Sequence, residues 1–192
     1  MVCPSVGSGN AAPYAQVRVG ILTCSDRGAR GQTEDTAGAY LKSAVAAMGW
    51  QVAEYAVVMD VASRITGRLR AWCDDKKLDV ILTCGGTGFG PRDVTPEATM
   101  ELLDRPAPGL TAALIAEGLT HTPLAALSRG VSGQRKSTII VNLPGSEKAV
   151  REGMALLSRV LPHAVEMVRG RTSTHPADGC PPAPPVEETG RA

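Results

Sequence analysis

The stretch covering residues 83–98 constrains the fold of this chain more than any other feature. It follows an apolar run at 79–82, which has the length and composition of a buried strand. Four glycines lie between residues 85 and 90, and the Thr-Pro-Glu sequence at 95–97 is typical of a helix start with an N-cap threonine. The sequence therefore predicts a strand, a glycine-rich loop and a helix in direct succession.

The composition of this loop favours an anion site. Glycines let several backbone N–H groups point at one anion, and a helix N-terminus also favours negative charge. Arg92 and Asp93 lie in the same loop and supply a cation for phosphate and a carboxylate for Mg²⁺. A Walker A loop is excluded because no lysine occurs between Lys77 and Lys136, and Pro91 occupies the third glycine position of a dinucleotide fingerprint.

The rest of the chain alternates between strand and helix patterns. Strands are expected at 17–23, 51–58, 79–83 and 137–142, and helices at 36–48, from residue 61, near Pro96, near Pro108 and from residue 146. This order predicts an α/β fold of three layers, with a mostly parallel sheet and helices on both faces. Residues 16–170 form the predicted domain, between a flexible leader at 1–15 and a Pro-rich disordered tail at 171–192.

Composition limits the partners. The chain has 20 Lys and Arg against 19 Asp and Glu, so its formal charge of +1 gives no reason to expect nucleic acid or an acidic membrane surface. No apolar run approaches the length of a membrane span. The N-terminus lacks the pattern of a secretion signal, and five cysteines form no Cys-x-x-Cys pair. Together these features favour free thiols in the cytoplasm. The three histidines show no metal-ligand spacing.

Five motifs in one order give the chain a family resemblance that spans residues 17 to 170. It resembles the molybdenum cofactor biosynthesis proteins: the MogA-type molybdopterin adenylyltransferases, the related MoaB proteins, and the G domains of gephyrin and its plant counterpart. The motifs are Thr23-Cys24-Ser25-Asp26, Asp35-Thr36-Ala37-Gly38, Gly85 to Ala98 with its Pro91-Arg92-Asp93-Val94-Thr95-Pro96-Glu97 core, Leu127-Ser128-Arg129, and Asn142-Leu143-Pro144-Gly145-Ser146.

The resemblance implies a reaction and its participants. It implies that AMP is transferred from Mg-ATP to the terminal phosphate of molybdopterin, with release of pyrophosphate. ATP and molybdopterin would be the substrates and Mg²⁺ the cofactor. The family also implies a homotrimer or hexamer and a partner that inserts molybdate.

Two aspartates are the candidate catalytic and metal-binding residues. Asp60 follows the strand at 51–58, and on spacing alone it reads more readily as an N-cap or turn residue. Family members carry an essential aspartate here, usually as Pro-Asp-Glu, whereas this chain has Met59-Asp60-Val61. Asp93 could form a local ion pair with Arg92, but a carboxylate in a phosphate loop would repel substrate unless a cation lay between them.

The candidate substrate-binding residues lie after predicted strands, where parallel sheets bind ligands. Ser128 matches a family serine that handles nucleotide or pterin, and Ser146 is also expected to cap the last helix. The whole set comprises Thr23, Ser25, Asp26, Asp35, Gly38, Gly85, Gly86, Thr87, Gly88, Arg92, Ser128, Asn142, Pro144, Gly145 and Ser146.

Other functions stay open at this point. A MoaB-type protein could bind molybdopterin without strong transferase activity, and competence-damage proteins carry a similar domain that hydrolyses nucleotides. A carrier or a scaffold like gephyrin is a third possibility. The short segment after the predicted domain argues against a second domain, and the two aspartates argue against a carrier that has lost catalysis. Residues 89–91 and 107–110 look closer to the MogA type.

Overall fold

The computed structural model describes residues 17–170 and contains one six-stranded mixed sheet in the order β2-β1-β3-β6-β5-β4. β1 (Arg18–Cys24), β2 (Gln51–Val58), β3 (Val80–Cys84) and β6 (Thr138–Leu143) run parallel. β5 (Ser132–Arg135) pairs antiparallel with β6, and the two-residue β4 (Arg105–Pro106) pairs antiparallel with β5. The predicted α/β fold with a mostly parallel sheet is confirmed.

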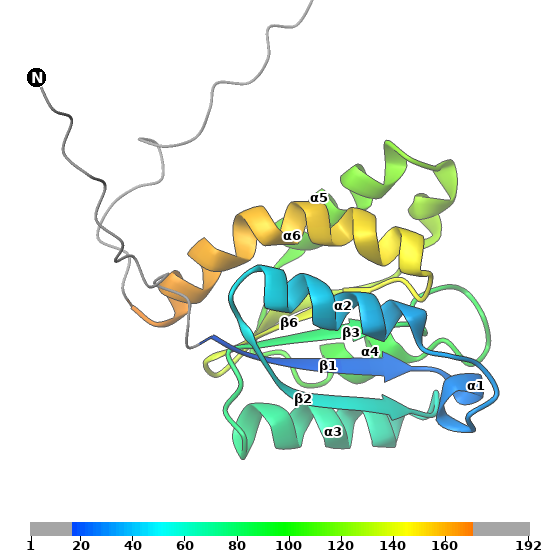
Figure 1. Cartoon of the computed structure of the whole chain (residues 1–192), viewed down its shortest axis with the longest axis horizontal. Helices are drawn as coiled ribbons and strands as arrows, with labels where there is room; N and C mark the ends of the chain where they lie inside the picture. The colour runs from blue at the N-terminus through cyan, green and yellow to red at the C-terminus, as the bar shows by residue number, and fades with distance from the viewer. Residues whose placement is uncertain (1–16, 171–192) are drawn as a thin grey trace, which may run out of the picture.

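Helices cover both faces of the sheet (Figure 1). α2 (Thr36–Ala47) and α6 (Glu147–Val168) pack on one face, whereas α3 (Ala62–Asp74) and α4 (Thr95–Met100) pack on the other. α5 (Pro108–Leu119) lies against α6 and continues into the 3-10 helix η1 (Pro123–Leu127). The short α1 (Asp26–Ala29) follows β1 directly.

Two apolar clusters hold these layers together. On the first face Ile21 and Leu82 pack with Leu41 of α2 and Leu157 of α6, and all four side chains are buried. On the second face Ile81 and its neighbours pack with Ile65, Leu69 and Trp72 of α3. Strands that are apolar on both faces are typical of a parallel sheet covered by helices.

The residues that end or cap the helices are those predicted from the sequence, with one exception. Ser146 caps α6, and its Oγ accepts from the N–H of Ala149 at 3.3 Å. Gly49, with φ +73°, follows Met48, the C-cap of α2, and ends the helix as predicted. The prediction of Thr95 as an N-cap is wrong, since Val94 holds that position and Thr95 is fully buried in the first turn of α4. Thr95 is already the first residue of α4, and its N–H donates to the Gly86 carbonyl oxygen at 3.1 Å, so the chain enters the helix one residue earlier than predicted.

Within residues 17–170, no helix combines the length and apolarity that crossing a bilayer requires. The predicted leader at 1–15 falls outside the described residues, as does the predicted tail at 171–192.

Candidate active site

The candidate site lies at the carboxyl edge of the parallel strands. The arrowheads of β1 and β2 point toward α1 and toward the loop that follows β3 (Figure 1). Ser25 follows β1, Asp60 follows β2, the glycine loop follows β3 and Pro144 follows β6. Because the four strands are parallel, the chain segments that leave them meet on one rim, as the sequence predicted.

Two glycines fix the start of the loop. Gly85 and Gly86 have φ of +95° and +62°, a region that costs L-residues with a side chain about 1–2 kcal/mol. A Cβ on Gly85 would collide with the Cys24 carbonyl oxygen, and one on Gly86 with Thr95 Oγ1. The loop after β6 also approaches this turn, though less tightly, since a Cβ on Gly145 would lie 3.3 Å from Gly85 Cα. The backbone can adopt this compact turn because these positions carry no side chain.

Two cavities open on this rim and share part of their walls. The larger has a volume of about 560 Å³ and lies between the glycine loop, α5, η1 and the start of α6. The smaller has a volume of about 410 Å³ and lies between β1, the start of α2 and the glycine loop. Both are lined by Gly86, Asp93, Gly145 and Ser146.

The two cavities differ in chemistry. The larger carries apolar side chains on one wall, among them Leu114, Ile115 and Leu127, and polar groups of the glycine loop on the other. The smaller is lined mainly by hydroxyls, carboxylates and glycine backbone, including Thr23, Asp35 and Asp60. A ring-containing molecule suits the first cavity, and a polyphosphate with a cation suits the second.

Asp60 lines the smaller cavity, and one of its carboxylate oxygens has no hydrogen-bond partner. Its Oδ2 accepts from the N–H of Asp26 at 2.7 Å, whereas its Oδ1 is buried and has no hydrogen-bond partner. Burial is the main cause that raises the pKa of the Asp60 carboxyl. The Asp26 N–H opposes this, and the negative charges of Asp26 and Asp93 raise the pKa further. A carboxylate held in this way gains from a nearby cation.

These features fit Mg²⁺. The described residues contain no group of three or more His, Cys, Asp or Glu side chains arranged around a metal. Mg²⁺ commonly takes only one or two carboxylates and completes its octahedron with phosphate oxygens and water. Asp60 and Asp93, which line the same cavity, would be those carboxylates.

Arg92 is paired inside the protein. Its Nε and Nη2 donate to Oδ2 and Oδ1 of Asp26, both at 3.0 Å. This bidentate pair is the main cause that lowers the pKa of the Asp26 carboxyl. Neither residue lines a cavity wall. Contact of Arg92 with phosphate stays a prediction. It does not require that Arg92 leave Asp26, because this pair uses only two of the five N–H donors of a guanidinium.

Asp35 and Thr23 form a network at the floor of the smaller cavity. The Asp35 Oδ2 accepts from the hydroxyls of Thr23 at 2.6 Å and Tyr55 at 2.7 Å. Its Oδ1 caps α2 by accepting from the N–H of Gly38 at 2.8 Å. A Cβ on Gly38 would collide with this carboxylate. Both Asp35 oxygens are therefore used internally, and Gly38 does not line either cavity.

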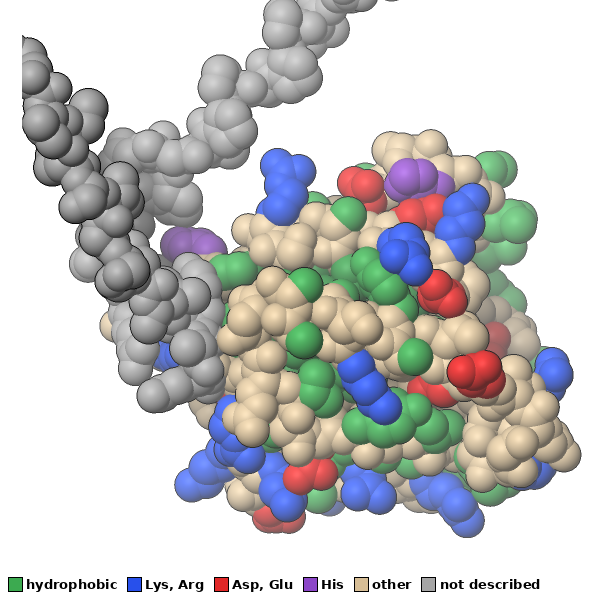
Figure 2. All heavy atoms as spheres, in the orientation of Figure 1, with side chains coloured by type: hydrophobic (Ala, Val, Ile, Leu, Met, Phe, Trp, Pro, Cys, Tyr) green, Lys and Arg blue, Asp and Glu red, His purple; other side chains and the backbone are tan. Residues whose placement is uncertain are grey.

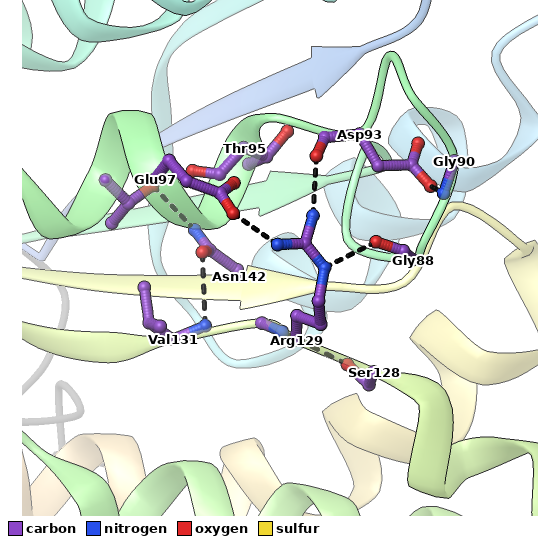
Figure 3. Close-up of polar contacts among 11 residues, drawn as sticks. Gly88, Gly90, Asp93, Thr95, Glu97, Ser128, Arg129, Val131 and Asn142 are labelled. Atoms are coloured by element: carbon purple, nitrogen blue, oxygen red, sulfur yellow. Dashed lines mark hydrogen bonds and ion pairs between the residues drawn. The ribbon is translucent and has the colours of Figure 1, made fainter.

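Asn142 is buried on the wall of the larger cavity, and its amide also has internal partners. Its Nδ2 donates to Thr83 Oγ1 and Thr99 Oγ1, and its Oδ1 accepts from the N–H of Val131 (Figure 3). Ser128 lines the same cavity, and its Oγ accepts from the N–H of Gly130 at 3.3 Å. In this arrangement Asn142 holds three segments together beside the cavity.

Comparison with known proteins identifies the family. Residues 20–163 match the model of a family described as "Probable molybdopterin binding domain". The chain belongs to this molybdenum cofactor biosynthesis family. The resemblance seen in the sequence is thereby confirmed.

Three relatives illustrate the range of the family. The chain is 44% identical over 79% of its length to the molybdenum cofactor synthesis protein cinnamon of Drosophila melanogaster, but spans only 26% of that protein. It is 33% identical over 80% of its length to a molybdopterin adenylyltransferase of Helicobacter pylori, covering 89% of that chain. A solved MoaB structure from Thermus thermophilus is 51% identical, with a TM-score of 0.76 over 80% of this chain and 97% of that one.

Most of the predicted site residues come together in this family fold. All of the predicted residues line one of the two cavities except Asp26, Gly38 and Arg92. The wall made by α5, η1 and one face of α6 was not among the sites predicted from the sequence. Ala149, Glu152 and Gly153 lie three and four residues apart on α6, a spacing that could have indicated this wall.

The two thiols beside the site are buried and free. Burial is the main cause that raises the pKa of both Cys24 and Cys84 to about 12. Thiols with such pKa values stay protonated at neutral pH and are poor nucleophiles. Cys3 and Cys180 lie outside the described residues.

Proposed function

We propose that this chain is a molybdopterin adenylyltransferase. The observation that carries the proposal is the shared wall of the two cavities, where Gly86, Asp93, Gly145 and Ser146 face both. Group transfer between two substrates needs both reacting groups at one point, in line and held still. In this proposal molybdopterin occupies the larger cavity with its phosphate at the shared wall, and ATP occupies the smaller cavity.

The reaction forms one bond and breaks another. An oxygen of the molybdopterin phosphate attacks the α-phosphorus of ATP, and the bond from that phosphorus to the bridging oxygen breaks as pyrophosphate leaves. The attacking phosphate is already ionised at neutral pH, so no general base is required. The glycine-loop backbone and the α6 N-terminus beside Ser146 would orient the phosphates, and bound Mg²⁺ would neutralise their charge.

The test is pyrophosphate release from Mg-ATP, with and without purified molybdopterin, together with detection of an adenylylated pterin. Release that depends on molybdopterin would establish the transferase. We expect Asp60→Asn and Asp93→Asn to reduce turnover by at least about 100-fold while pterin affinity changes little. Equal loss of turnover and binding would assign both aspartates to structure instead.

A second candidate is a MoaB-type protein that binds molybdopterin without strong transfer, which the 51% identity to the Thermus protein named MoaB favours. Tight pterin binding without pyrophosphate release would support it. Hydrolysis of nucleotide without pterin would instead support the competence-damage-like alternative. A homotrimer or hexamer, a molybdate-inserting partner and a cytoplasmic location are further proposals. Free Cys24, Cys73 and Cys84 agree with the last of these.

A further inference from the structure

Arg129 contacts the glycine loop through both its main chain and its side chain. It lies between η1 and β5, in the segment that also carries Ser128 on the wall of the larger cavity. Its backbone N–H donates to the carbonyl oxygen of Thr87 at 2.8 Å. The main chain of this segment is thus hydrogen-bonded to the loop independently of the Arg129 side chain.

The guanidinium of Arg129 then bridges the two sides of the loop tip (Figure 3). Its Nε donates to the Gly88 carbonyl oxygen at 2.7 Å, and its Nη2 donates to the Asp93 carbonyl oxygen at 2.6 Å. Its Nη1 is bonded to the carboxylate of Glu97 in α4. A planar guanidinium can hold three such acceptors at once, which an ammonium cannot do in the same fixed geometry.

The charge pairing and the position of Arg129 differ from those expected of a cation that binds substrate. The Glu97 carboxylate balances its charge, and that contact is the main cause that lowers the pKa of Glu97. Arg129 lines neither cavity, whereas both Gly88 and Asp93 do. The guanidinium therefore binds backbone carbonyl oxygens of the loop without lining either cavity itself.

The position of Asp93 depends on this tip. The Asp93 carboxylate accepts from the N–H of Gly90 at 3.0 Å, and the Asp93 N–H donates to the Gly90 carbonyl at 2.9 Å. These two hydrogen bonds connect Gly90 and Asp93 within the loop tip. Arg129 holds the same tip from outside, through the carbonyl oxygens of Gly88 and Asp93. Without the guanidinium, the Arg129 N–H would still hold Thr87, but only the local turn bonds between Gly90 and Asp93 would hold the loop tip.

We propose that Arg129 is a positioning residue that clamps the glycine loop so that Asp93 stays at the shared wall of the two cavities. This proposal deepens the proposed transferase function and rests on it. Loss of the clamp should lower the rate of transfer more than substrate affinity, because a loop displaced by about 1 Å can cost about 100-fold in rate.

Arg135 provides a matched control. It is also half-buried, pairs bidentately with the Asp74 carboxylate at 3.2 and 2.7 Å, and donates to the Leu102 carbonyl at 3.2 Å. Its strand position pairs with Thr138 at the start of β6, at the opposite end of the sheet from the site. Arg135→Ala therefore removes a similar structural arginine without touching the loop.

The experiment compares Arg129→Ala, Arg129→Lys, Glu97→Gln and Arg135→Ala in the full chain. We expect Arg129→Ala to lower kcat by about 30- to 300-fold with the dissociation constant for molybdopterin within about threefold. Arg129→Lys should recover less than about a tenth of the lost rate, since one ammonium cannot span both carbonyls. Glu97→Gln and Arg135→Ala should stay within about threefold of wild type in kcat, because both keep the two carbonyl bonds.

Hydrogen exchange of residues 85–95 gives a readout that does not need the reaction. The amides of Gly90, Asp93 and Thr95 are bonded within the loop. Their exchange should accelerate in Arg129→Ala and stay at the wild-type rate in Arg135→Ala. If wild type releases no pyrophosphate while this exchange pattern holds, the transferase proposal fails and the clamp stands. Wild-type exchange in Arg129→Ala, or equal kinetic losses in both alanine variants, would overturn the clamp.

Discussion

Asp60 combines an unfavourable environment with a cation-binding arrangement, and this predicts a trade-off between stability and activity. Burial raises its pKa, so the folded state favours the protonated carboxyl and ionisation of Asp60 destabilises the fold at neutral pH. Asp60→Asn should therefore keep or raise the melting temperature at pH 7 while it lowers turnover. Its amide oxygen can still accept from the Asp26 N–H.

The pH dependence gives this prediction its control. The destabilisation in wild type should fade as pH drops through the raised folded pKa, and it should vanish below the unfolded value of about 3.9. The stability difference between Asp60→Asn and wild type should thus be largest near pH 7 and shrink in acid. Urea unfolding at several pH values measures it, and a difference that grows in acid would contradict the assigned burial.

The buried thiols give a second prediction at this scale. Because the pKa of Cys24 and of Cys84 is raised to about 12, both stay neutral at pH 8. Iodoacetamide should alkylate neither residue in the folded protein and both in urea, as peptide mass spectrometry would report. Cys84→Ala should keep pyrophosphate release within about fivefold of wild type. Rapid labelling of the native protein at either residue would show an accessible thiolate instead.

The sequence predicted which residues lie at the site more successfully than it predicted the role of each residue there. Asp60, Asp93 and Ser128 line the cavities, and strand endings alone already placed most such residues on one rim. The use of Asn142 and Asp35 in internal networks depends on partners 59 and 20 residues away, respectively. No local pattern predicts such pairings, and the contacts of Arg129 with Gly88 and Asp93 could not be predicted for the same reason.

At the scale of elements, the glycine loop should tolerate no side chain at Gly86. Gly86→Ala combines a positive φ with a collision at Thr95 Oγ1, so it should lower the free energy of unfolding by about 1–3 kcal/mol. Gly67→Ala, on the exposed face of α3 with no atom within 4 Å of the new Cβ, should instead stabilise by about 0.5–1 kcal/mol. Chemical denaturation of both variants checks the contrast, and similar destabilisation of both would contradict it.

The bounds of a strand could be predicted from the sequence where burial gives the strand an apolar pattern. β2 begins and ends at the predicted residues 51 and 58, and β3 and β6 are shifted by one residue from their predicted bounds. β4 and β5 were not predicted because they are short and polar and contain Pro106 and Gly133, and of the two only β4 lies at an edge of the sheet. β5 pairs with β6 and β4 pairs with β5, so the formation of both depends on a neighbouring strand more than on their own composition.

At the scale of the whole molecule, apolar side chains are exposed at the corner formed by α5 and η1. α5 has no buried residue although it is rich in Ala, Leu and Ile. Leu119 at its end and Leu124 in η1 are exposed, and Figure 2 shows hydrophobic side chains gathered at the right-hand edge over this α5–η1 corner. Contiguous apolar surface of this kind is typical of protein–protein contacts.

If this α5–η1 corner is the contact of the proposed homotrimer, one charge there should dissociate it. Leu124 is 69% exposed, so Leu124→Glu should fold as wild type but elute as a monomer, because burying an unpaired carboxylate opposes association. Met167→Glu, at a residue 58% exposed near the end of α6, is the matched control and should keep the wild-type mass. Size exclusion with light scattering measures both. A monomeric wild type, or a Leu124→Glu protein of unchanged mass, would place the contact elsewhere or remove it.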